Sequence, residues 1–238
     1  MKKAYLDVET GGFNNKEDAL LEIAIVPVID GERLAPFVSY MMPPSELKID
    51  DGALKVNGIK RCDILTYKPE KEVLLGMCSY LEKLDTRLVF TAYNAPFDRS
   101  FVKQWFIRSN MEPEFNFFFR PISCDILEKA KTKQKYFPVR SANLKLTTLT
   151  KLFKIAHDGA HTALSDVNAM IDLDIILDSL GVELSLMDQL DYRTSCKKFL
   201  DSKYIIFNAD GDIFINKQTI KDPSAFRFIL SELWEMYG

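Results

Sequence analysis

The chain has 238 residues, of which 47% are hydrophobic and 27% are charged, the balance of an ordinary globular protein. Its formal net charge of −3 argues against a protein that coats nucleic acid, because such proteins carry a basic face, but not against an enzyme that grips a few phosphates. No apolar run is long enough to cross a bilayer and no signal segment follows the first methionine, so we expect a cytoplasmic protein without membrane contact.

The N-terminal third predicts strands over 3–9, 20–28 and 33–41, with the hairpin signal Asp30-Gly31 between the last two. Helices and strands then alternate. They are expected at 70–84 (helix), 87–93 (strand), 97–109 (helix), 117–124 (strand), 125–131, 146–154 and 163–179 (helices). This order predicts an α/β fold with a mixed sheet and helices on its faces.

The chain is expected to divide near residue 180. Residues 1–180 hold the α/β domain, and 181–238 form a small C-terminal extension. In the extension, 203–217 predicts a hairpin and 222–237 a closing helix.

Two acidic residues lie on helix faces that are otherwise apolar. The residues one and two turns after Asp98 and Asp166 are mostly hydrophobic, so both carboxylates belong to stripes that pack inward. An unpaired carboxylate there is costly and must be neutralised, paired or bound to a metal. Both acids also fall near predicted helix starts, so a helix cap is the alternative for each.

Asp7 and Glu9 form a second unusual pair. They alternate with Leu6 and Val8 on a predicted strand, so both carboxylates point to one face and repel unless a cation lies between them. On an edge strand they would simply be solvated. Four converging acids would suit two Mg²⁺ or Mn²⁺ ions, which prefer carboxylate oxygens.

The chain has two histidines, His157 and His161. His161 lies in the loop five residues before Asp166, where a histidine with an ordinary pKa of about 6.5 suits a general base. For His157 we expect a solvated loop side chain. A zinc site made by both is the alternative, although no HExxH motif and no nearby cysteine support it.

Three motifs in this order resemble those of the DnaQ-like, or DEDDh, 3′→5′ exonucleases. They are Asp7-Val-Glu9-Thr10-Gly11, like DxETTG; Asn94-Ala-Pro-Phe97-Asp98, like NxxFD; and His161-Thr-Ala-Leu-Ser-Asp166, like HxAxxD. The resemblance covers residues 1–178. The chain departs from the pattern with Gly12-Phe13 after the first motif and Val167 after the third.

The resemblance implies an RNase H-like fold with a five-stranded mixed sheet flanked by helices. It also implies roles for individual residues. Asp7, Glu9, Asp98 and Asp166 would hold two Mg²⁺ or Mn²⁺ ions, His161 would deprotonate the attacking water, and Thr10, Gly11, Asn94 and Phe97 would seat the terminal nucleotide.

The function expected from the resemblance is removal of nucleoside 5′-monophosphates from single-stranded 3′ ends. DNA is favoured over RNA, because a small oligoribonuclease would not need the extension 181–238. A proofreading or DNA-processing role in replication or repair would follow if the extension binds a polymerase. The alternatives are a 3′→5′ exoribonuclease and, in another class, an inactive nucleic-acid-binding or scaffold protein.

A basic stretch lies in the second half of the domain. Lys131, Lys133, Lys135, Arg140 and Lys145 surround Tyr136 and Phe137. The stretch is either a loop that guides a single strand or an ordinary solvated loop. In the extension, Gln189–Tyr192 weakly resembles a sliding-clamp-binding peptide, and an amphipathic structural segment is the alternative.

Overall fold

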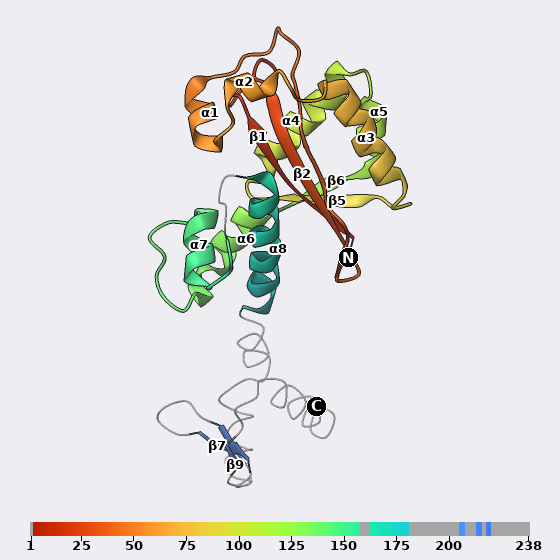
Figure 1. Cartoon of the computed structure of the whole chain (residues 1–238). Helices are drawn as coiled ribbons and strands as arrows, with labels where there is room; N and C mark the ends of the chain where they lie inside the picture. Colours follow the sequence, from red (N-terminus) through yellow and green to blue (C-terminus); the bar gives the residue numbers. More distant parts are fainter. Residues whose placement is uncertain (1, 158–161, 181–204, 208–212, 216–217, 220–238) are drawn as a thin grey trace. The chain divides into compact units, whose positions relative to one another are not determined.

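The computed structural model describes residues 2–157, 162–180, 205–207, 213–215 and 218–219. The chain divides into two compact units, Met1–Leu180 and Gly181–Gly238 (Figure 1). None of the helices in the described ranges is long and apolar enough to span a membrane.

The first unit is built on one mixed sheet of six strands. The strands are β1 Lys3–Thr10, β2 Leu20–Ile29, β3 Glu32–Arg33, β4 Phe37–Tyr40, β5 Leu88–Ala92 and β6 Phe119–Asp125. Central β1 runs antiparallel to β2 and parallel to β5, β6 runs parallel to β5, and both β3 and β4 pair antiparallel with β2.

This arrangement confirms the mixed α/β fold, with one strand more than the five expected. The single strand predicted over 33–41 is divided into β3 and β4, and Pro36, which has no N–H for a strand ladder, stands between them. The predicted turn is confirmed, because Asp30 and Gly31 both have positive φ, of 53° and 91°, as a tight hairpin requires.

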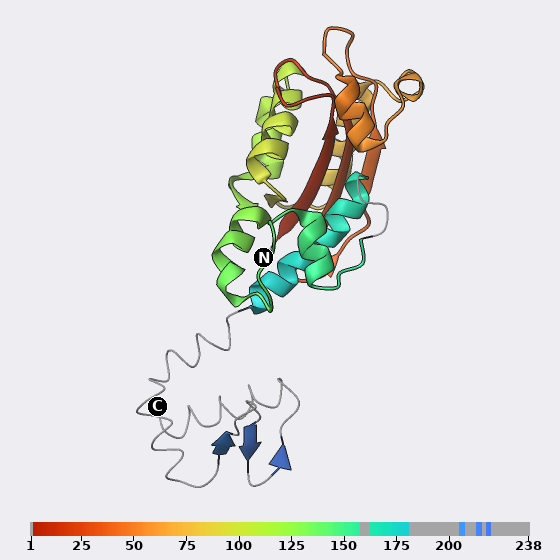
Figure 2. The same ribbon diagram turned by 90° about the vertical axis from the view of Figure 1, so that its left-hand side faces the viewer.

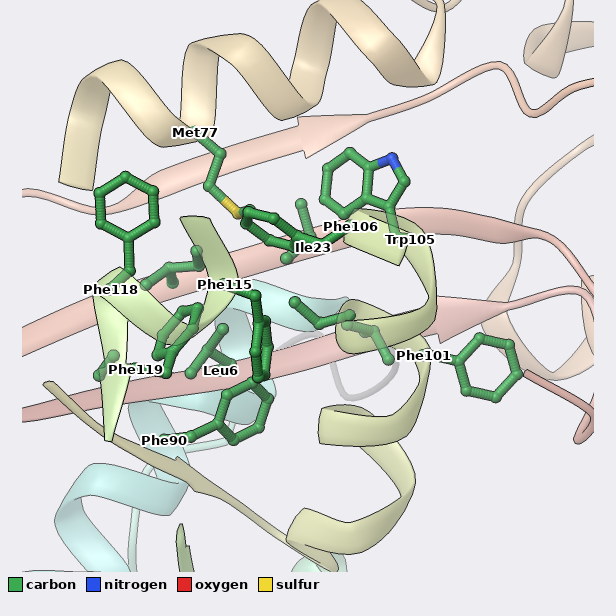
Figure 3. Close-up of a cluster of buried hydrophobic side chains, with 14 of the residues drawn as sticks. Leu6, Ile23, Met77, Phe90, Phe101, Trp105, Phe106, Phe115, Phe118 and Phe119 are labelled. Atoms are coloured by element: carbon green, nitrogen blue, oxygen red, sulfur yellow. The ribbon is translucent and has the colours of Figure 1, made fainter. Parts of the chain in front are cut away.

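One face of the sheet is covered by α3 Glu70–Glu82, α4 Ala95–Arg108 and α5 Glu112–Phe118. Figure 3 shows Leu6 from β1 and Phe90 from β5 among Met77, Trp105 and Phe115 of these helices. All five side chains are buried. Their burial removes a large apolar area from water and fixes α4 against the sheet.

The opposite face is covered by α6 Ile126–Lys133, α7 Leu146–Leu152 and α8 Ala163–Ser179. Tyr5 and Val26 of the sheet pack with Val167, Met170 and Leu173 of α8. Figure 2 shows the strands between α4 and α8. The helices predicted at 125–131, 146–154 and 163–179 are confirmed to within two residues at each end.

Two short helices near the end of β1 were not predicted. They are α1 Asp51–Asn57 and α2 Arg61–Ile64, and a 3₁₀ turn, η1, follows α6 at Gln134–Tyr136. Asp50 caps α1 by accepting from the N–H of Ala53, and Gly58 ends it with a φ of 71°. Leu54 and Ile64 pack against Leu21 and so close this end of the sheet.

In the second unit, β7 Ile205–Phe207 pairs antiparallel with β8 Ile213–Ile215, within the range 203–217 that was predicted as a hairpin. β9 Gln218–Thr219 adds a third antiparallel strand. The predicted closing helix over 222–237 and the peptide Gln189–Tyr192 lie outside the described residues.

Candidate active site

The central strand β1 carries the first two acidic residues of the site. Asp7 and Glu9 alternate with Leu6 and Val8, which belong to the core under α3 and α4. The acidic side chains therefore lie on the face that α8 covers. Asp7 and Glu9 pair with β2, and both are half-buried, so full solvation at a sheet edge does not explain the pair.

Asp166 joins this pair from α8. Asp7, Glu9 and Asp166 each place one carboxylate oxygen so that the three atoms lie within 4.8 Å of one another. Asp166 stands in the first turn of α8, but Thr162 occupies the cap position of that helix. A capping role therefore does not account for this carboxylate.

Asp98 reaches the same region from the first turn of α4, where Asn94 occupies the cap position. Its side chain is buried, with 3% of the residue exposed. Burial raises the pKa of Asp98 well above its ordinary value, and hydrogen bonds from the N–H groups of Asp98 itself and of Val8 offset part of that effect. The Val8 contact holds Asp98 against β1 at the residue between Asp7 and Glu9.

The four carboxylates differ in how closely they meet. Asp98 is not part of the trio whose oxygens lie within 4.8 Å. It does act on that trio, because burial and then the charge of Asp98 are the largest causes that raise the pKa of Asp7 well above its usual range. The structure thus brings together the four acids predicted from the sequence, three of them in mutual reach and Asp98 beside Asp7.

Glu9 is subject to the same repulsion. Burial, then the charges of Glu22 and Asp166, raise the pKa of Glu9 from 4.5 to about 8. A divalent cation among these carboxylates would replace repulsion with attraction, and their oxygens are the donors that Mg²⁺ and Mn²⁺ prefer. The donor set therefore fits the ions implied by the motifs.

Glu22 is a fifth acidic residue that the sequence interpretation missed. It lies opposite Glu9 in the β1–β2 register and is 2% exposed. Burial raises its pKa, while hydrogen bonds from the Ala163 N–H and from Tyr40 lower it. Glu22 therefore binds the N-terminal end of α8, where the Thr162 side chain makes no capping hydrogen bond. The signal was a single acid within the ten-residue apolar strand β2.

The expectation of a solvated His157 is wrong. Its side chain is 6% exposed, and Nε2 lies 2.5 Å from Oδ1 of Asp166. Nδ1 lies 3.3 Å from the hydroxyl of Thr150, which is buried in α7. His157 therefore holds the carboxylate of Asp166 from the side of α7. His161 lies outside the described residues, so its role as a base stays a prediction.

A cavity of about 710 Å³ adjoins the carboxylate group at Glu9. Glu9, Thr10, Phe13 and Phe97 are among its lining residues. Phe13 is 92% exposed, and its ring stands edge-on to Phe97 at a centroid distance of 6.3 Å. An apolar ring so exposed beside a polar site offers a stacking surface, and the sequence interpretation did not identify it as a contact residue.

The remaining predicted contact residues lie around this cavity or next to it. Gly11 packs against the backbone of Lys48, whose carbonyl oxygen would lie 2.7 Å from a Cβ at this position. The Thr10 hydroxyl donates to the Gly12 carbonyl at 2.6 Å. Asn94 is exposed at the start of α4, with a φ of 69°. Contact of these residues with a nucleotide stays a prediction.

A protein-family model described as exonuclease matches residues 5–173. The chain belongs to this exonuclease family. The resemblance to the DnaQ-like 3′→5′ exonucleases of the RNase H-like superfamily is thereby confirmed. The matched range includes Asp7, Glu9, Asp98 and Asp166, and it contains the whole sheet except the first two residues of β1.

Individual relatives agree with the family. Over 185 residues, or 78% of the chain, it is 26% identical to the DNA polymerase III PolC-type of Staphylococcus haemolyticus, of which the match covers 12%. Over 108 residues, or 41% of the chain, it is 39% identical to the ribonuclease T of Photorhabdus laumondii, of which the match covers 50%. The chain thus spans half or less of the length of these relatives.

The solved structures show the same fold. Exonuclease I of E. coli, crystallised with a dT13 oligonucleotide, matches with a TM-score of 0.66 and 19% identity over 88% of this chain and 46% of that one. A second exonuclease I structure gives a TM-score of 0.66 at 20% identity. Their likeness shows that this chain shares the fold of exonuclease I.

Proposed function

We propose that this chain is a metal-dependent 3′→5′ exonuclease that removes nucleoside 5′-monophosphates from single-stranded 3′ ends, with DNA as the favoured substrate. The observation that carries the proposal is the group of four carboxylates, buried or half-buried, beside a cavity with two aromatic rings. Family membership and the order of the motifs support the same activity.

Asp7, Glu9, Asp98 and Asp166 would hold two Mg²⁺ or Mn²⁺ ions. Such ions, when bound, supply activation of the attacking water and stabilisation of the leaving oxygen. Glu22 and His157 would keep the carboxylate cluster in place, Glu22 by binding the start of α8 and His157 by holding Asp166.

His161 would take the proton of the attacking water. Its place in the sequence supports this role, because His161 precedes by five residues Asp166, which lies in the first turn of α8. The ordinary pKa of a histidine side chain allows proton uptake near neutral pH.

The terminal base would enter the cavity between Phe13 and α1, whose residues Ala53 and Val56 line the cavity. Base stacking on an aromatic ring tolerates any base, as a nuclease that degrades a strand stepwise requires. Phe97, Thr10 and the backbone at Gly11 and Gly12 would then contact the terminal nucleotide, with Asn94 at its edge.

DNA is favoured by two relatives. The exonuclease I structure holds a dT13 oligonucleotide, and PolC is a DNA polymerase whose matching segment is 12% of its length. The latter supports a proofreading or DNA-processing role, with a polymerase as partner of residues 181–238. The second candidate is a 3′→5′ exoribonuclease, favoured by 39% identity to a ribonuclease T.

The test is degradation of matched single-stranded DNA and RNA, labelled at the 5′ end, with Mg²⁺ or a chelator. We expect a ladder of products shortened from the 3′ end, release of 5′-monophosphates, faster loss of DNA than RNA, and no reaction with chelator or in Asp7→Asn. Cleavage only within the strand, or equal activity of Asp7→Asn, would refute the proposal. Faster loss of RNA would select the second candidate.

A further inference from the structure

Charge is distributed very unevenly along this chain. Acidic residues outnumber basic ones, 34 to 31, yet all eight charged residues between positions 129 and 154 are Lys or Arg. They are Lys129, Lys131, Lys133, Lys135, Arg140, Lys145, Lys151 and Lys154. A concentration of one sign in a chain of opposite net charge indicates a surface for an anionic partner.

Two of the eight have internal structural roles. Lys129 pairs with Asp174 at 2.5 Å, and Lys133 donates from Nζ to the Leu180 carbonyl at 2.6 Å. The other six are exposed. Lys131 pairs with Glu128, but both side chains are at least half exposed, so this pair contributes little and leaves Lys131 available to a stronger anion.

Three of the six exposed cations line a groove. Lys131, Lys135 and Arg140 line a hollow of about 580 Å³ together with Phe137 and Val139. The Nζ of Lys135 also stands 4.7 Å from the ring centroid of the neighbouring Tyr136. Cations interleaved with aromatic rings are the combination that holds phosphates and stacks bases of a single strand.

Two contacts join residues 131–154 to the elements that carry the carboxylates. The Tyr93 hydroxyl, just before α4 and Asp98, donates to the carbonyl of Leu144 within the segment. At its other end, α7 packs against α8, and His157 holds Asp166. The segment therefore forms a wall next to the site rather than a separate appendage.

We propose that residues 131–154, named here the basic segment, bind the phosphodiester backbone of a single strand upstream of the 3′ end that enters the site. The inference rests on the proposed exonuclease function and adds where the rest of the substrate lies. Two features favour nucleic acid over an anionic membrane: the aromatic rings beside the cations, and the contacts that join the segment to the carboxylates. Val139 is the one large aliphatic side chain strongly exposed in the described groove, too little apolar surface for insertion into lipid.

The test compares strand length and salt dependence. The groove variant carries Lys131→Glu, Lys135→Glu and Arg140→Glu. With an oligonucleotide of about thirty nucleotides, we expect kcat/KM of the variant to be lower than that of wild type by tenfold or more. The slope of log affinity against log salt concentration should become shallower by about two, because three phosphate contacts are lost. With a substrate of about three nucleotides, we expect kcat/KM within about twofold of wild type, because so short a strand reaches the cavity alone.

The matched control carries the same change of charge at exposed lysines elsewhere, Lys60→Glu, Lys71→Glu and Lys83→Glu. It should keep activity on the long strand near that of wild type. Equal losses in both variants would show a general charge effect and overturn the inference, as would equal losses on short and long substrates in the groove variant.

Binding measured with metal chelated separates this inference from the proposed function. Fluorescence anisotropy of the long strand with full-length protein should show weaker binding by the groove variant even if no hydrolysis is found. If wild type binds the strand more tightly than the groove variant but does not hydrolyse it when metal is added, only the nuclease proposal is refuted. Unchanged strand binding, with loss of binding to phosphatidylserine vesicles instead, would assign the segment to a membrane.

Discussion

At the scale of single residues, the site consists of carboxylates whose negative charges repel one another. Burial, Glu22 and Asp166 raise the pKa of Glu9 to about 8. The folded, metal-free protein therefore holds more protons than the unfolded chain between pH values of about 4.5 and 8. Its stability falls as pH rises through that window, and bound cations reverse the penalty by replacing the protons.

Phe13 is the residue whose exposure most needs an explanation. If it stacks on the terminal base, Phe13→Ala should lower kcat/KM on single strands by roughly tenfold. A tenfold change corresponds to about 1.4 kcal/mol, within the range of about 1–3 kcal/mol that one stacked base contributes. Because Phe13 is 92% exposed, the free energy of unfolding should change by less than about 0.5 kcal/mol.

The control for this substitution is Phe117→Ala, which removes another exposed ring, 65% exposed, in α5. Steady-state kinetics should show no effect there. If Phe13→Ala leaves kcat/KM unchanged, the ring does not contact the substrate and the cavity does not hold the terminal base.

At the scale of elements, a second buried cluster fixes α8 on β1. Asp174 is 1% exposed and accepts at 2.5 Å from each of Lys3, Tyr5 and Lys129. Asp174 lies eight residues, about two turns, after Asp166 on α8, and Lys3 and Tyr5 lie on the same face of β1 as Asp7 and Glu9. The cluster therefore sets the register between the two elements that carry Asp7, Glu9 and Asp166.

Removal of the negative charge of Asp174 should strongly destabilise the folded protein. Asp174→Asn is expected to lower the free energy of unfolding by about 3 kcal/mol, because it removes the buried carboxylate of Asp174 from the partly buried ammonium of Lys3 and leaves Lys129 with Asp178 alone. Asp172→Asn, which breaks an exposed pair with Arg33, should cost less than about 1 kcal/mol. Urea unfolding at neutral pH measures both, and equal costs would mean that the cluster does not anchor α8.

The same cluster predicts a pH dependence. Burial would raise the pKa of Asp174, but hydrogen bonds from Lys129, Lys3 and Tyr5 outweigh burial and hold the pKa below its ordinary value. A carboxylate with a lowered folded pKa stabilises above its unfolded pKa, and the contribution disappears as pH falls through the folded value. The difference between wild type and Asp174→Asn should therefore shrink in acid, below a pH of about 4.

At the scale of the whole molecule, the sequence predicted what periodicity and spacing encode. Asp7 and Glu9 alternate on a strand, and Asp98 and Asp166 interrupt apolar helix faces, so physical anomaly and motif order pointed to the same four residues. The long helices α3, α4 and α8 were found for the same reason, because their apolar stripes repeat over several turns.

Other elements depend on tertiary contacts that no local pattern contains. The strand predicted over 117–124 begins only at Phe119, because α5 continues to Phe118. Phe115 and Phe118, three residues apart, enter the core together, and this packing favours a helix in a run of aromatic residues that otherwise resembles a strand. The short helix α1 likewise exists through its cap and its packing on β2.

Within the site, the residues missed were those whose role comes from a distant partner. Glu22 accepts a hydrogen bond at the start of α8, and His157 contacts Asp166. The lone acid in β2 was a usable signal for Glu22. For His157 no spacing rule was available, because its two partners, Thr150 and Asp166, lie on different helices, α7 and α8, whose packing no local pattern contains.

The account depends most on one divalent-cation site formed by Asp7, Glu9, Asp98 and Asp166, and calorimetric titration with Mn²⁺ tests it directly. Wild type should bind about tenfold or more tightly at pH 8.5 than at pH 6.5, because the protons held by Glu9 and its neighbours must leave first. Asp7→Asn should bind at least tenfold more weakly at pH 8.5. No Mn²⁺ binding by wild type, or undiminished binding by Asp7→Asn, would contradict the account.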